Sequence, residues 1–95
     1  PVEYIQAMAS LYRRSGQRGA ILAHYRQQFR RRLSERYGVD TSVTDNELVK
    51  IIVYHDPTVD ETVLRDLLTR LSQKSESEAE LLALARDVDA FLKAI

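Results

Sequence analysis

The stretch Thr44-Asp45-Asn46-Glu47-Leu48-Val49-Lys50-Ile51-Ile52-Val53-Tyr54 decides the fold of this chain. Thr44 and Glu47 have the spacing of a capping box, in which two side chains satisfy free amides at a helix start. The residues that follow are apolar nearly all round, so this helix is predicted to be the central and most buried element. Its β-branched residues also favour a strand, but nothing else in the chain could pair with one, and an isolated strand is marginal.

Two helices are predicted before this stretch. Apolar residues recur at steps of three and four over about 2–14, and Ser15-Gly16 offers a stop. A second apolar stripe runs over about 17–37, where Gly38 is positioned as a C-terminal cap. The residues between Gly38 and Thr44 are predicted to form a loop.

Two further helices are predicted after it. Asp56-Pro57 forces an extended break, and Thr58-Val59-Asp60-Glu61 then repeats the capping-box spacing before a leucine stripe over about 59–72. Ser75-Glu76-Ser77-Glu78 gives a third box, and the last helix runs to the C-terminus. The predicted fold is therefore all-α, a single-domain compact bundle of about five helices, with the second and the last helix the longest.

The composition is typical of one globular domain, and its charged residues are distributed unevenly between a basic first part and an acidic second part. The 95 residues are 44% hydrophobic, enough to bury a core without disulfides or metals. Residues 1–38 carry eight arginines against two acids, whereas residues 39–95 carry six bases and twelve acids, so the net charge is zero. With no cysteine, a disulfide framework, a zinc-thiolate site and a cysteine nucleophile are excluded.

The basic half predicts an anionic neighbour. This neighbour could be the acidic half of the same fold, a membrane surface, a nucleic acid or another protein. Arg30-Arg31-Arg32 spans about 200° of a helical wheel, so the three side chains cannot all enter one groove. The residues expected to contact a membrane surface or phosphate groups are Arg13, Arg14, Arg18, Arg26, Arg30 and Arg31.

Neither histidine has a partner at the spacing of a metal site. His24 is expected to be exposed on the helix at 17–37, and His55 is expected to cap the helix that ends beside it. Nearby acids are explained by helix capping, so we expect no catalytic, metal or cofactor-binding residues and no enzyme activity.

The alternative function is a nucleic-acid-binding domain that uses the arginine-rich helix at 17–37. Two features count against it. The helix at 59–72 would take the place of a recognition helix, yet it begins with Asp60-Glu61. The net charge of zero also removes the long-range attraction that is typical of DNA-binding proteins.

A pattern of arginine, tyrosine and leucine runs through the basic half. It consists of Leu11-Tyr12-Arg13-Arg14-Ser15, Arg18, Tyr25-Arg26, Phe29-Arg30-Arg31-Arg32-Leu33 and Arg36-Tyr37-Gly38. With the later run Glu80-Leu81-Leu82-Ala83-Leu84-Ala85-Arg86, the pattern resembles the C-terminal cytosolic helical segment of the domain-of-unknown-function family 4350, which comprises bacterial membrane proteins. In that family a transmembrane helix and a region similar to glutamine amidotransferases precede the segment, and the genes commonly sit near those for MoxR-type AAA ATPases.

The resemblance implies a non-catalytic cytosolic interaction module of a bacterial membrane protein, on the cytoplasmic side of the inner membrane, with an AAA ATPase as a partner. No apolar run approaches the roughly 18 to 20 residues that cross a bilayer, so the chain as given is expected to be soluble. Its start at Pro1 suggests a fragment of a longer protein, although removal of a methionine before proline gives the same start, and a hydrophobic stretch of about 20 residues just before Pro1 would settle the topology. A protein-binding surface is expected to combine apolar side chains with the acidic rim of the last two helices. Its candidate residues are Asp66, Leu71 and Asp87.

Overall fold

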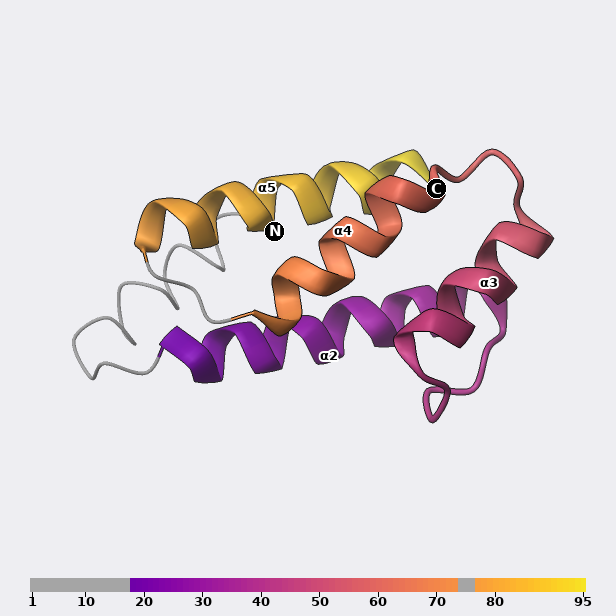
Figure 1. The fold of residues 1–95 in the computed structure, drawn as a ribbon, viewed down its shortest axis with the longest axis horizontal. Coiled ribbons are helices and arrows are strands. Elements are labelled where there is room, and N and C mark those ends of the chain that lie inside the picture. The colour runs from indigo at the N-terminus through magenta and orange to yellow at the C-terminus, as the bar shows by residue number, and fades with distance from the viewer. Residues whose placement is uncertain (1–17, 74–76) are drawn as a thin grey trace.

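The computed structural model describes residues 18–73 and 77–95, and within them it shows four helices and no strand (Figure 1). The all-α prediction is confirmed, whereas the helix expected over 2–14 lies outside the described residues. The two longest of these helices are the first and the last, with 20 and 17 residues, as predicted. The helices are α2 (Arg18–Tyr37), α3 (Asp45–His55), α4 (Glu61–Ser72) and α5 (Glu78–Ala94).

The predicted boundaries between α2 and α3 are confirmed. Gly38 adopts a φ of 67°, and the amide of Val39 donates to the carbonyl of Ser34 over 3.0 Å, which closes the last turn of α2. At the start of α3, the Glu47 amide donates to Thr44 Oγ1 over 3.2 Å, and the Thr44 hydroxyl donates to the Glu47 carboxylate over 3.1 Å. The first bond confirms Thr44 as the predicted cap, whereas the second joins the two side chains in place of the bond from the Thr44 backbone amide that would complete a capping box.

The start of α4 corrects the expected capping box at Thr58. The N-cap is Asp60, whose carboxylate accepts from the amide of Val63 over 3.2 Å. Thr58 instead donates both its amide and its hydroxyl to Asp56 Oδ1, within the turn that follows α3. An aspartate at position 60 can fill the cap as well as a threonine, so the spacing alone placed the boundary too early.

The start of α5 lies later than the third predicted box. Its N-cap is Ser77, which accepts from the amide of Glu80 over 3.0 Å, and the helix begins at Glu78. Ser75, which the sequence pattern favoured as the cap, lies outside the described residues.

The prediction that α3 is the central and most buried element is wrong. In α3 only Leu48, Val49 and Ile52 are buried, and Tyr54 is 81% exposed. The central helix is α4, which packs against α2, α3 and α5 and lies between the two long helices (Figure 1). The leucine stripe of α4 packs against three neighbouring helices, which buries it. In contrast, α3 lies at one end of the molecule and buries only the face that it turns to the core.

The long helices α2 and α5 also meet each other. The rings of Phe29 and Phe91 pack edge to face with centroids 6.0 Å apart, and the Tyr25 hydroxyl lies 3.5 Å from the carbonyl oxygen of Ala85. One core therefore joins all four helices. Its buried apolar residues are Ile21, Leu22, Tyr25, Phe29, Leu33, Leu48, Val49, Ile52, Val59, Leu64, Leu67, Leu68, Leu71, Leu81, Leu84, Ala85, Val88 and Phe91.

Candidate functional site

Two hollows lie along the seam where α4 meets α5, and Arg70 lines both of them. We call the pair the α4–α5 groove and take it as the main candidate for a binding site; its first hollow lies where α4 begins and α5 ends. Val63, which lines this hollow, is 44% exposed, and among the described residues Tyr54 is the other large apolar side chain that is exposed. The first hollow is lined by Val63, Asp66, Leu67, Arg70, Asp87, Ala90, Phe91 and Ala94.

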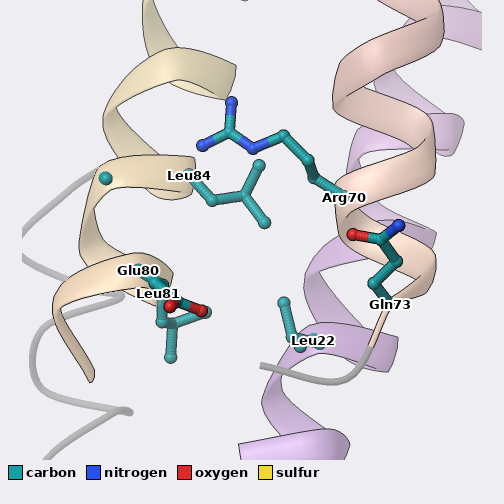
Figure 2. A pocket seen from close by; sticks show the side chains of 7 residues that line it. Leu22, Arg70, Gln73, Glu80, Leu81 and Leu84 are labelled. Carbon is teal, nitrogen blue, oxygen red and sulfur yellow. The ribbon is translucent and has the colours of Figure 1, made fainter. Parts of the chain in front are cut away.

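The second hollow lies at the other end of the groove, where α2 closes it from below (Figure 2). Its floor consists of the buried side chains of Leu22, Leu81 and Leu84, and its rim carries Gln73 and Glu80. The side chain of Arg70 extends from α4 toward α5 and lines both hollows (Figure 2). The groove therefore has an apolar floor and a polar rim.

Arg70 bridges the groove in its middle. Its Nη1 atom lies 2.8 Å from Asp87 Oδ2 on α5 and 3.5 Å from Asp66 Oδ2 on its own helix. The hydrogen bond to Asp87 is the main reason why the pKa of Arg70 is raised. Two carboxylates thus face one guanidinium, which leaves this part of the rim acidic.

Of the three predicted partner-binding residues, the structure brings two to the surface. Asp66 and Asp87 have side chains that are 60% and 55% exposed, and both line the groove. Leu71 is a correction, because it is only 2% exposed and packs in the core. It faces inward with Leu64, Leu67 and Leu68, since all four belong to the buried stripe of α4. Val63 is the exposed apolar residue that sequence reasoning missed.

Two arginines of α2, Arg26 and Arg30, are held within the fold by hydrogen bonds. Arg26 Nη2 lies 2.9 Å from both carboxylate oxygens of Asp45, at the start of α3, and its Nε donates to Ser72 Oγ over 3.0 Å. Arg30 is buried; it donates to the same carboxylate and to the backbone carbonyls of Thr41 and Val43. These bonds fasten α2 to the loop before α3.

The other candidate arginines are Arg31, Arg18, Arg13 and Arg14. Arg31 is exposed and lies 3.7 Å from Glu35, a contact typical of a weak surface ion pair. Arg18 begins α2. Arg13 and Arg14 lie outside the described residues. Of the candidates, Arg31 is therefore the one with a side chain shown to face solvent.

Neither histidine is placed for catalysis or metal binding among the described residues. His24 is exposed, and its Nε2 lies 3.0 Å from Gln28 Nε2 one turn later. His55 is the exposed last residue of α3 and packs edge to face against Tyr54 with centroids 5.3 Å apart. In residues 18–73 and 77–95, no three His, Cys, Asp or Glu side chains are grouped as a metal site would need.

A polar contact holds the two ends of the connection around α3. The Tyr37 hydroxyl donates to Asp56 Oδ2 over 2.9 Å, which links the end of α2 to the end of α3. Burial, followed by this bond to a carboxylate, raises the pKa of Tyr37 to about 12. Bonds from Thr58 and then from Tyr37 lower the pKa of Asp56. Arg36, whose guanidinium carbon lies 5.1 Å from the centroid of the Tyr37 ring, adds a positive charge beside the pair and acts to lower both pKa values.

The described part of the chain has no helix with the length and apolar character of a bilayer span. No protein-family model matches the chain, and comparison with curated proteins and with solved structures finds no match.

Proposed function

We propose that this chain is a non-catalytic cytosolic interaction module of a bacterial membrane protein, and that it docks a protein partner through the α4–α5 groove. The observation that carries the proposal is the exposed Val63 beside an apolar floor that is flanked by exposed carboxylates of Asp66 and Asp87. Protein interfaces commonly combine such an apolar centre with a polar, charged rim.

The groove favours an amphipathic helix as its occupant. Two helices already line the seam, and a third helix can lay an apolar stripe along a groove of this kind. Among the rim residues Asp66, Asp87, Glu80 and Arg70, the acids outnumber the single base. A partner helix that carries lysine or arginine beside its apolar stripe would match this charge, and a helix flanked by acids would be repelled.

The membrane context and the ATPase partner rest on the resemblance to the domain-of-unknown-function family 4350. In that family the segment is tethered beside the inner membrane, where a local docking site would act on partners recruited to the cytoplasmic face. A MoxR-type AAA ATPase is the natural first partner to test, because such genes are typical neighbours in that family.

Two synthetic amphipathic helical peptides with the same apolar stripe test the proposal. One peptide carries lysine and arginine flanks and the other carries aspartate and glutamate flanks. We expect the whole chain to bind the basic peptide in a titration and to bind the acidic one more weakly by at least about tenfold, since like charges across an interface cost several kcal/mol.

Variants then locate the binding face. Asp66→Lys should weaken binding of the basic peptide, whereas Glu35→Lys on α2 makes the same change of charge at an exposed position outside the groove and should leave binding nearly unchanged. Equal affinity for the two peptides, or equal losses from the two variants, would contradict the proposal.

A further inference from the structure

A separate, positively charged hollow lies between α2 and the loop that precedes α3. We call it the arginine pocket; it is independent of the α4–α5 groove. It is lined by Arg26, Gln27, Arg30, Arg31 and Thr41. Every lining residue carries a hydrogen-bond donor on its side chain, and three of the five carry a positive charge.

Asp45 orients two of these guanidinium groups without neutralising the pocket. Arg26 and Arg30 share the single carboxylate of Asp45, and Arg31 is only loosely paired with Glu35 at 3.7 Å. The three guanidinium groups therefore carry one more positive charge than the two carboxylates of Asp45 and Glu35 can balance. Because the bonds to Asp45 and to the loop carbonyls hold Arg26 and Arg30 in place, little side-chain entropy remains to be lost when a ligand binds.

The two held guanidinium groups also keep unused donors. Among the described residues, no group accepts a hydrogen bond from Arg26 Nη1 or from Arg30 Nε, although other nitrogens of both side chains are bonded. Arg31, Gln27 and Thr41 add further donors at the same hollow. The positive charge of this set of donors disfavours a bound cation. Its N–H and O–H groups can donate hydrogen bonds to the oxygens of an anion.

We propose that the arginine pocket binds a phosphate group. Guanidinium groups match the oxygens of phosphate with forked hydrogen bonds, and an amide and a hydroxyl complete the shell. The phosphate can belong to a small soluble molecule or to the headgroup of an anionic lipid, and both sources present the same oxygens. The pocket extends over residues 26–31, about one and a half turns of α2, and over one loop residue.

Titration of the whole 95-residue chain with inorganic phosphate tests the pocket, with chloride holding the ionic strength constant. The readouts are the NMR signals of the Gln27 side-chain amide and of the arginine Nε–H groups. We expect saturable shifts with one-to-one stoichiometry. Shifts that grow linearly without saturation, as expected for ionic screening alone, would overturn the proposal.

Two variants and one matched control locate the site. Arg31→Gln should weaken phosphate binding by at least about threefold, the size expected when one exposed charge partner is lost. Thr41→Val should weaken it through the lost hydroxyl, while Arg86→Gln removes the same charge from an exposed position on α5 and should not change the affinity. Equal losses from Arg31→Gln and Arg86→Gln would overturn the proposal.

Vesicle flotation distinguishes the two sources. Vesicles of phosphatidylglycerol are compared with vesicles of phosphatidylcholine, at about 0.15 M salt, where the Debye length is about 8 Å and long-range attraction is screened. If the chain binds phosphatidylglycerol vesicles and Arg31→Gln reduces this binding, the ligand is a lipid headgroup. Saturable binding of inorganic phosphate without flotation identifies a soluble phosphate compound.

Discussion

Arg70 on α4 and Asp87 on α5 lie 2.8 Å apart, Nη1 to Oδ2, and their bridge crosses the α4–α5 groove between its two hollows. Asp66, one turn before Arg70, approaches the same nitrogen to 3.5 Å. The bridge joins the two helices at the residue that lines both hollows. It also fixes where charge lies on the rim that a partner would meet.

A double-mutant cycle with Arg70→Gln and Asp87→Asn measures this bridge. We expect a coupling free energy of about 0.5 to 1 kcal/mol in chemical denaturation, because the pair is partly exposed, and a smaller value at high salt. The matched control is Arg65 with Glu61, a pair 3.0 Å apart within α4. Its coupling should be about 0.3 to 0.5 kcal/mol. A coupling for Arg70 and Asp87 that did not change with salt would be inconsistent with the bridge.

Two substitutions on α3 test which of its faces is in the core. Ile52 is fully buried, so Ile52→Asp should cost several kcal/mol and remove most of the cooperative unfolding transition, because a small domain has only about 5 to 15 kcal/mol in total. Tyr54→Asp, two residues later at an 81% exposed position, should change stability by less than about 0.5 kcal/mol. Thermal and urea unfolding measure both, and similar melting of the two variants would refute this packing.

The phenol of Tyr37 should make the free energy of unfolding depend on pH in the alkaline range. Its pKa is raised from 10.0 to about 12, so the stability that this phenol adds is fully present below pH 10 and is lost as the pH rises toward about 12. A difference titration of tyrosinate absorbance between the parent chain and Tyr37→Phe should show one phenol with a pKa of about 12. Asp56→Asn should lower that value only in part, since burial is the larger cause. A full return to 10.0 would show that the carboxylate alone is responsible.

Arg30 and Arg31 are adjacent but should differ in their effect on stability. Arg30→Met keeps the apolar stem and removes the guanidinium that binds Asp45 and two loop carbonyls, which should cost about 1 to 3 kcal/mol. Arg31→Met, at an exposed position, should cost less than about 0.5 kcal/mol. Urea unfolding compares them, and hydrogen exchange should show loss of protection in the loop of the Arg30 variant alone. Equal stability of the two variants would argue against the role of Arg30 in fastening this loop.

Local rules predicted most of the fold. The cap at Thr44, the glycine after Tyr37 and the break at Asp56-Pro57 each depend on residues within a few positions, and the structure confirms all three. The central place of α4 could not be read from such signals. The dense apolar run of α3 favoured that helix, but which helix lies in the middle depends on how all of them pack, and local pattern carries no such information.

In the candidate site too, local sequence signals predict contacts within one helix but not contacts between helices. The spacing of Asp66 and Arg70 already permits a pair along one helix, yet only the crossing of α4 and α5 brings Asp87 to the same guanidinium. The charge split in the sequence left open an internal partner for the arginines, and Asp45 is such a partner for two of them. It lies at the start of α3, directly after the Thr44 cap.

Photocrosslinking at the mouth of the groove tests the central claim, that a protein partner docks on the α4–α5 groove. A benzoyl-phenylalanine at position 63, in the groove, is compared in expressing cells with one at position 54 on α3, the other exposed large hydrophobic position in the part of the chain that the structure describes. We predict that position 63 captures one segment with a helical apolar stripe flanked by lysine or arginine, that Asp66→Lys abolishes this adduct, and that position 54 does not form it. No such adduct at position 63, or one that forms equally from position 54 and survives Asp66→Lys, would contradict the account.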